Sequence, residues 1–179
     1  ISVNTIAIVV PVFNRREFTL NCLASLRKQA TNGFTVIVVD DGSSDGTAQA
    51  VNELYPEVVL LKGDGTLFWS GSMNLGINYA LERNFDYVIS LNNDLEVAKD
   101  YVEKMIVWAR KRPDALLGSL SVNIDTGELD FGGCRIDWKT GKTHSLLREL
   151  PEEKRKGLHS VTHFCGRGLW IPSGVFKQI

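Results

Sequence analysis

The feature that most limits how this chain can fold is the alternation, along residues 5–111, of apolar runs and segments with helical periodicity. Residues 5–12 form a continuous β-branched run, which is typical of a strand buried on both faces of a sheet. Further strands are predicted at 34–39, 57–61 and 87–91, and helices at 15–30, 72–83 and 99–111, with one more ending near Leu54. This alternation predicts βαβ units, and therefore a mostly parallel α/β sheet with helices on both faces.

The first two helices have candidate caps. Asn14 is placed to cap the first helix, and Ser44 or Asp45 to cap the second, because short polar side chains accept the free N–H groups of a first turn. The apolar residues of the first helix recur at helical spacing and are Phe18, Cys22, Leu23 and Leu26.

The pattern changes after Pro113. Short strand-like pieces at 115–122 and 129–136, joined by glycine-containing turns, predict a small antiparallel C-terminal appendage that covers an open site. Residues 171–179 resemble the end of a strand followed by a helix that has barely begun, whose carbonyl groups would lack partners. We therefore expect a fragment of a longer protein; the alternative is a natural terminus with a short docking helix.

Composition and charge exclude several classes of protein. The formal net charge of -1 gives no support for a nucleic-acid partner, and the mixed-charge run 148–156 is typical of a solvated surface. The apolar runs are strand-sized, well short of the ~20 residues of a membrane-spanning helix, and the sequence shows no signal peptide. Cys22, Cys134 and Cys165 form no CxxC pair, so neither a disulfide framework nor a zinc site is expected.

Polar residues follow each of the four predicted strands. In open α/β sheets, ligands bind outside the carboxyl ends of the strands. The residues expected at this edge are Pro11, Phe13 and Arg15, then Asp40 and Asp41, then Asp64, and finally Asn92, Asn93 and Asp94. Carboxylates gathered at one edge repel one another unless a cation, hydroxyl groups or amide donors satisfy them. An Asp there can accept hydrogen bonds from a ribose or a base, and one beside a diphosphate can hold Mg²⁺ or Mn²⁺.

Plainer interpretations exist for each piece. Residues 40–46 also fit a polar turn with a helix cap, and 92–94 fit another turn. The glycines at 63 and 65 form no P-loop, because no GKS or GKT follows, and no GxGxxG follows the first strand. Hydrolysis of nucleoside triphosphates and dehydrogenase chemistry are therefore disfavoured. The occurrence of all the pieces in order, on successive strand ends, favours a functional site.

The motifs together resemble those of the family 2 glycosyltransferases of the GT-A fold. The matching segments are 8–15, 38–47, 63–69, 73–77 and 91–94, with a weaker match at 166–172. The likeness is greatest to the bacterial branch that adds sugars such as rhamnose to surface polysaccharides. It implies inverting transfer of a sugar from a UDP- or dTDP-sugar to a glycan or lipid-linked glycan. It also implies a single domain, 1–179, with a nucleotide-sugar-binding half at 1–97 and an incomplete acceptor-side half at 98–179.

The resemblance also implies roles for individual residues and a location. Donor nucleotide binding falls to Pro11, Phe13 and Arg15, which line the base and ribose pocket, to Asp41 or its alternative Asp40, which binds the nucleoside, and to Asp64. The diphosphate and sugar fall to Trp69, Asn74, Asn92 and Asn93, and Asp94 holds Mg²⁺ or Mn²⁺. Trp69 is equally compatible with a packing role, because a Trp beside a glycine loop often packs. The full-length protein is expected in the cytoplasm, associated peripherally with the inner membrane.

Two departures from the family pattern matter. Asn92 stands where the Asp-x-Asp motif has its first acid, which removes one charge from the metal site but leaves a neutral oxygen ligand. The family's general base, an Asp or Glu that takes the acceptor's proton, is expected beyond Ile179. His159 and His163 are expected to be structural, the alternatives being a catalytic role or contact of His163 with the diphosphate. Cys165 is expected to be a small buried residue.

Two other functions compete with glycosyl transfer. A sugar-nucleotidyltransferase uses a related α/β site, although such enzymes usually carry a glycine- and arginine-rich loop where this chain has Phe13-Asn14-Arg15-Arg16. A non-catalytic nucleotide-sugar-binding module is the third possibility. We expect the chain by itself to bind a nucleoside diphosphate and to transfer little or no sugar.

Overall fold

The computed structural model describes residues 5–146 and 150–178. The chain forms two compact units, one comprising the residues up to Leu117 together with those from Trp170 onward, and the other comprising Gly118–Leu169. The sequence predicted a functional boundary at residue 97, between a nucleotide-sugar-binding half and an acceptor-side half, and this boundary stays a prediction. Within the described residues, no helix reaches the length and apolarity that crossing a membrane requires.

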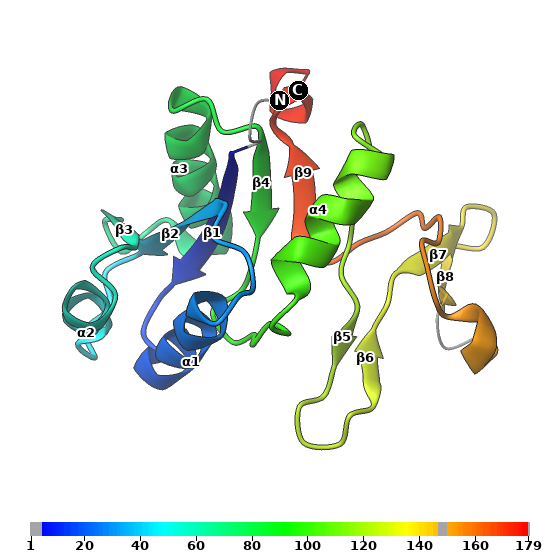
Figure 1. Ribbon diagram of the computed structural model, residues 1–179, viewed down its shortest axis with the longest axis horizontal. Coiled ribbons are helices and arrows are strands. Elements are labelled where there is room, and N and C mark those ends of the chain that lie inside the picture. The colour runs from blue at the N-terminus through cyan, green and yellow to red at the C-terminus, as the bar shows by residue number, and fades with distance from the viewer. Residues whose placement is uncertain (1–4, 147–149, 179) are drawn as a thin grey trace. The chain divides into compact units, whose positions relative to one another are not determined.

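The first unit is built on a sheet with the strand order β3-β2-β1-β4-β9 in the described residues. The strands are β1 (Ile6–Val12), β2 (Phe34–Asp40), β3 (Val59–Lys62), β4 (Tyr87–Ser90) and β9 (Leu169–Pro172). β1 pairs in parallel with β2 and β4, and β2 pairs in parallel with β3. The arrow of β9 points opposite to that of β4 (Figure 1), and the N–H of Ser173 donates to the carbonyl of Asp86, just before β4. The predicted mostly parallel sheet is confirmed.

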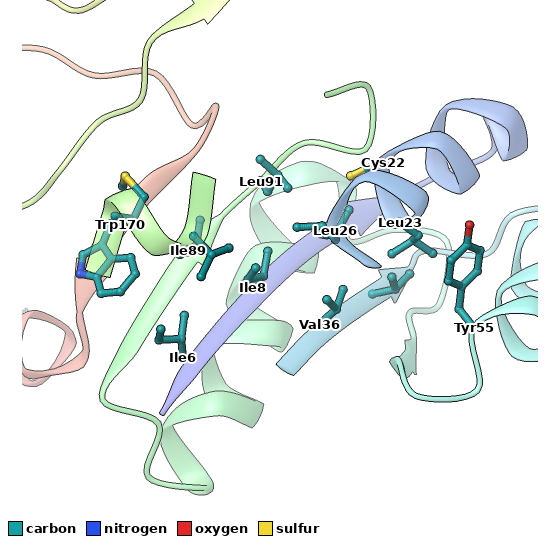
Figure 2. Packing of buried hydrophobic residues seen from close by; sticks show 14 of the residues in the cluster. Ile6, Ile8, Cys22, Leu23, Leu26, Val36, Tyr55, Ile89, Leu91 and Trp170 are labelled. Atoms are coloured by element: carbon teal, nitrogen blue, oxygen red, sulfur yellow. The ribbon is translucent and has the colours of Figure 1, made fainter. Parts of the chain in front are cut away.

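Helices cover both faces of this sheet because successive residues of a buried strand point to opposite sides. Ile6, Ile8 and Val10 of β1 pack in one cluster with α1 (Arg16–Arg27), α2 (Thr47–Leu54) and α4 (Tyr101–Lys111). Ala7 and Val9 pack in a second cluster with α3 (Phe68–Glu82). Figure 2 shows the first cluster, which extends from Tyr55 across β1 to Trp170.

The helix ends differ from the prediction in their caps, in one buried position and in the start of α3. Arg15, not Asn14, occupies the N-cap position of α1, and the Asn14 side chain instead accepts the N–H of Ser44. The N-cap position of α2 is Gly46, and of the two candidate caps Asp45 is the one that accepts the N–H of Thr47 in the first turn. Phe18 is exposed and Thr19 is the buried residue at that turn. α3 begins at Phe68 rather than at residue 72, four residues earlier than its apolar spacing indicated.

The second unit contains two antiparallel pairs, β5 (Ser121–Val122) with β6 (Leu129–Phe131), and β7 (Cys134–Asp137) with β8 (Lys142–Ser145). The predicted strand at 129–136 is thus divided in two, because Gly133 adopts a left-handed backbone, with φ +88°. The predicted antiparallel character is confirmed. Whether this unit covers an open site stays a prediction. Of the mixed-charge run 148–156, residues 148 and 149 lie outside the described residues, and η1 (Glu152–Lys154) is a single 3₁₀ turn.

The segment after the second unit returns to the first. β9 is followed by a 3₁₀ turn, η2 (Ser173–Lys177), as the sequence predicted for a strand followed by a short helix. Residue 179 lies outside the described residues.

Candidate functional site

The carboxyl ends of β1, β2 and β4 border a cavity of about 350 Å³ in the first unit. The residues that line this cavity come from the end of β1, from the loops after β1, β2, β3 and β4, and from the first turns of α3. They are Pro11, Val12, Phe13, Arg15, Asp41, Gly65, Phe68, Trp69, Ser72 and Asn93. The position agrees with the general rule for open α/β sheets. The cavity lies at the edge of the sheet where the sequence predicted a ligand site, and binding of a ligand there stays a prediction.

Asp41 holds the glycine loop that forms one wall of the cavity. The residue is 4% exposed, and its two carboxylate oxygens accept the backbone N–H groups of Gly65 and Phe68, each at 2.8 Å. A Cβ at Gly63 would lie 2.5 Å from Oδ1 of Asp41, so only glycine fits where the loop passes this carboxylate. The contact holds Phe68 in a left-handed backbone conformation, with φ +54°, which costs energy for an aromatic residue. Phe68 is consequently left 81% exposed at the cavity.

The loop after β1 is also held in a strained conformation. Asn14 and Arg15 have φ values of +56° and +59°. Reciprocal hydrogen bonds stabilise this backbone, since the N–H of Asn14 donates to Oγ of Ser43 at 2.7 Å and the N–H of Ser44 donates to Oδ1 of Asn14 at 2.9 Å. Asp45 accepts the N–H of Arg16, and hydrogen bonds from Thr47 and then from Arg16 lower its pKa. Consecutive strained residues held by so many bonds are typical of a functional loop.

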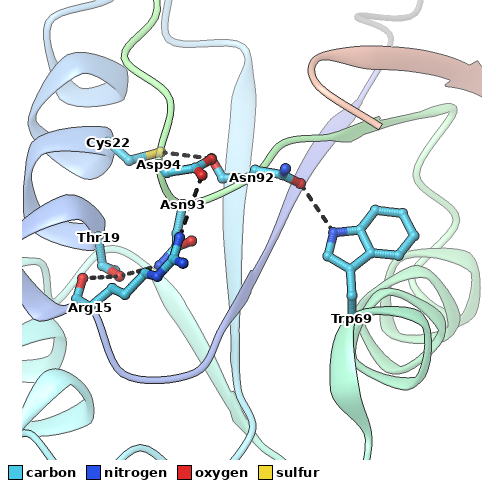
Figure 3. A network of polar contacts seen from close by, with 7 residues as sticks. All are labelled: Arg15, Thr19, Cys22, Trp69, Asn92, Asn93 and Asp94. Carbon is cyan, nitrogen blue, oxygen red and sulfur yellow. Dashed lines mark hydrogen bonds and ion pairs between the residues drawn. The ribbon is translucent and has the colours of Figure 1, made fainter. Parts of the chain in front are cut away.

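The loop after β4 is tied to both neighbouring helices (Figure 3). Oδ1 of Asn92 accepts the indole N–H of Trp69 at 3.1 Å, and the side-chain amide of Asn93 donates to Oγ1 of Thr19 at 3.0 Å. Asp94 lies 3.6 Å from the guanidinium of Arg15, measured from Oδ2 to Nη1. The sequence did not predict this ion pair.

Cys22 lies directly beneath this loop and provides a test of its packing. Its thiol is buried and donates to the backbone carbonyl of Asn92 at 3.8 Å. Burial, and then the charges of Asp94 and Glu96, raise the pKa of this thiol to about 12.

Cys22 should therefore resist alkylation by iodoacetamide at pH 8–9 until the chain unfolds, because the thiolate is the reactive form. Half-buried Cys134 and Cys165 should react first, which peptide mapping by mass spectrometry would show. The unfolded thiol ionises near its ordinary pKa of 9.0 and the folded thiol only near 12, so the free energy of unfolding should fall as the pH rises between these values. Rapid labelling of Cys22 in the native protein would contradict this packing.

The oxygen ligands at this edge of the sheet fit a hard divalent cation when a bound diphosphate supplies part of its coordination. The described residues contain no group of three or more His, Cys, Asp or Glu side chains able to hold a metal. Mg²⁺, however, is commonly bound through one or two carboxylates together with substrate phosphates and water. Asp94, whose side chain is 37% exposed, can supply one such carboxylate. The residues fit a cation that a bound diphosphate helps to hold.

Some of the predicted site residues line the cavity and others do not. Pro11, Phe13, Arg15, Asp41, Trp69 and Asn93 line the cavity. Asn92 and Asp94 do not line it, but each bonds a residue that does. Asp40 is buried and accepts the N–H of Ser43. Asp64 accepts hydrogen bonds from Thr66, which lower its pKa, and Asn74 is exposed on α3; neither lines the cavity.

Four of the lining residues, Val12, Gly65, Phe68 and Ser72, had no role assigned from the sequence, although Val12 and Gly65 lie in segments that were expected at this edge. Phe68 and Gly65 belong to the segment 63–69 used for the resemblance. Ser72 lies three residues after Trp69, so it shares a face with Trp69 once the helix is known to begin at Phe68. The histidines predicted to be structural, His159 and His163, do not line the cavity.

Comparison with known proteins shows the family to which this chain belongs. The family model described as "Glycosyl transferase family 2" matches residues 7–179. The chain is 30% identical over 157 residues to the N-acetylglucosaminyl-diphospho-decaprenol L-rhamnosyltransferase of Mycobacterium tuberculosis, a match that covers 83% of this chain and 47% of that protein. It is 24% identical over 164 residues to the uncharacterized glycosyltransferase YibD of Escherichia coli, covering 90% and 42%. The chain thus spans less than half the length of these relatives.

Solved structures of glycosyltransferases share the fold. S. aureus TarS (residues 1–349) superimposes with a TM-score of 0.67 at 17% identity, over 97% of this chain and 48% of that one. The mannosyltransferase PcManGT of Pyrobaculum calidifontis, solved with GDP-Man and Mn²⁺, superimposes with a TM-score of 0.58 at 20% identity, over 65% and 35%. The sheet is therefore of the GT-A type. With the family model matched along nearly all of its length, this chain belongs to glycosyl transferase family 2.

Proposed function

We propose that this chain is the donor-binding part of an enzyme that transfers a sugar, with inversion, from a nucleoside-diphosphate sugar to a glycan or lipid-linked glycan. The observation that carries the proposal is the cavity at the carboxyl ends of the strands, with Phe13 and Asp41 lining it and Asp94 beside it. Family membership favours transfer over a nucleotidyltransferase or a non-catalytic module.

Asp41 is the better candidate than Asp40 for binding the nucleoside. Asp41 lines the cavity, whereas the side chain of Asp40 is buried and bonds the turn at Ser43. A carboxylate has about four lone-pair sites, so Asp41 can accept a hydrogen bond from the donor in addition to the two backbone N–H groups that it already accepts. Phe13 and Phe68 offer exposed aromatic faces on which a base can stack.

The names of similar proteins support this choice of donor and cation. PcManGT was solved with GDP-Man and Mn²⁺, and TarS with UDP and with UDP-GlcNAc. For the present chain we propose that Asp94 holds Mg²⁺ or Mn²⁺ against the donor's diphosphate, where the cation offsets the charge that develops on the leaving group. We expect the general base that deprotonates the acceptor to lie outside residues 1–179. We also expect the enzyme to be cytoplasmic and to associate peripherally with the membrane.

Calorimetry with UDP, dTDP and GDP, with Mn²⁺ or with EDTA, would test the proposal. At least one of the three should bind more tightly with Mn²⁺. Asp94→Asn should reduce that Mn²⁺-dependent gain by about tenfold or more, because a charged contact is worth roughly 1.5–3 kcal/mol. Glu96→Gln, which removes the same charge from an exposed position in the same loop, should leave it unchanged. A gain from Mn²⁺ that survives Asp94→Asn would remove the role assigned to Asp94.

A further inference from the structure

Arg15 places a permanent positive charge where the family pattern concentrates negative charge. Its guanidinium lies 3.6 Å from Asp94, and both side chains are substantially exposed, at 62% and 37%. An ion pair this exposed is worth little, typically 0–1 kcal/mol. Arg15 also lines the cavity. The guanidinium is thus free to exchange Asp94 for a more strongly charged partner that enters the cavity.

Trp69 determines which end of the Asn92 amide faces it. An indole N–H can only donate, so the atom that it contacts at 3.1 Å is the amide oxygen of Asn92. One of the two lone pairs of the oxygen that a cation would require is therefore already used, and the NH₂ group is the other arm of the amide (Figure 3). An NH₂ group donates hydrogen bonds to anions and does not bind cations.

Both contacts make the loop after β4 less suited to binding a cation and better suited to binding an anion. In place of a second carboxylate, the loop after β4 has a neutral amide whose oxygen already accepts one hydrogen bond, and a guanidinium lies against the remaining carboxylate, Asp94. Arginine is well suited to diphosphate binding because its planar group donates two parallel hydrogen bonds. The bonds of Asn14 to Ser43 and Ser44 hold the strained backbone from which the Arg15 side chain extends, which reduces the part of the entropy cost of binding that comes from ordering this loop.

We propose that Arg15 and Asn92 bind the diphosphate of the donor and supply part of the stabilisation that a metal supplies in a two-acid site. This inference rests on the function proposed above. Nucleoside diphosphates then bind with appreciable affinity in the absence of metal, and Mn²⁺ strengthens that binding through Asp94. Arg15 acts on the diphosphate, rather than on the base and ribose as the sequence predicted.

The test is calorimetric titration of the chain with UDP, dTDP and GDP, in EDTA and in Mn²⁺. Wild-type protein should bind at least one of them in EDTA. Arg15→Gln should weaken the binding in EDTA roughly 10- to 100-fold, the effect of removing a charge-assisted hydrogen bond. Arg16→Gln removes the same charge one residue along, at an exposed position outside the cavity lining, and should have little effect.

Asn92→Asp provides the complementary variant. It keeps an oxygen for the indole of Trp69 but replaces the NH₂ group with a second anionic oxygen. Binding in EDTA should weaken, whereas the gain from Mn²⁺ should increase, because the site then has two acids for the cation. Thermal denaturation in the absence of nucleotide should show that both variants remain folded, with melting temperatures close to that of the wild type.

The outcomes separate this inference from the proposed function. Binding that requires Mn²⁺ and is undetectable in EDTA would overturn the inference and leave the proposed function standing. Equal affinities of Arg15→Gln and Arg16→Gln in EDTA would also overturn it. If none of the three nucleotides binds under either condition, both proposals fail.

Discussion

Replacing Asp41 with alanine should lower the free energy of unfolding by about 2–4 kcal/mol and weaken nucleotide binding by more than tenfold. The reason is that one buried carboxylate anchors the loop at two points, the N–H groups of Gly65 and Phe68. Without it, Phe68 loses the hydrogen bond from its N–H to Asp41 that helps hold its left-handed backbone, and the loop that forms the cavity wall should relax.

Urea denaturation and calorimetry on the same samples would measure both effects. Asp41→Asn is the sharper variant, because its NH₂ group would face one of the two N–H donors and leave that donor without an acceptor. Asp114→Asn, a matched loss of charge at an exposed position of the same unit, should change the free energy of unfolding by less than about 0.5 kcal/mol. Equal stabilities of Asp41→Asn and Asp114→Asn would show that the loop does not depend on this carboxylate.

Trp170→Ala should lower the free energy of unfolding of the first unit by about 3–5 kcal/mol, the usual cost of deleting a buried aromatic side chain. Trp170 is 1% exposed and packs in the cluster with Ile6, Ile8 and Ile89 (Figure 2). Its ring centroid lies 4.7 Å from that of Tyr87. Its backbone also exchanges hydrogen bonds with Leu117. The strand that follows the second unit thus completes the core of the first.

Two variants control for this result. Trp138→Ala removes the same side chain from a position that is 79% exposed and should change stability by less than about 0.5 kcal/mol. Trp170→Phe should cost far less than Trp170→Ala, because the buried indole N–H has no hydrogen-bond partner in the described residues and its loss leaves the aromatic packing in place. Denaturation midpoints that are the same for Trp170→Ala and Trp138→Ala would show that β9 is not part of the core.

The elements of the first unit could be predicted because each has a strong local pattern. The residues of β1 are buried on both faces and therefore apolar without interruption, and α1 and α4 present apolar residues at helical spacing. The start of α3 could not be predicted in this way. Phe68 enters the helix through a left-handed conformation that an aromatic residue rarely adopts, and a carboxylate in another loop, that of Asp41, holds it there.

The second unit was harder to predict because its strands are two to four residues long and largely exposed. Short exposed strands bury too little surface to leave a clear alternation of apolar and polar residues. The division at Gly133 depends on a positive φ, which the presence of a glycine permits but does not require.

For the candidate site, the sequence by itself determined which residues stand at the carboxyl ends of the strands, because the order of strands and helices decides which loops share an edge of the sheet. It also determined the family, through motifs on successive strand ends. Only the tertiary structure decided that Arg15 lies against Asp94, and that the oxygen of Asn92 faces Trp69. The physical reason is that such pairs join loops far apart in the chain, so their contacts depend on the packing of α1 and α3 against the sheet and on backbone strain that no local pattern records.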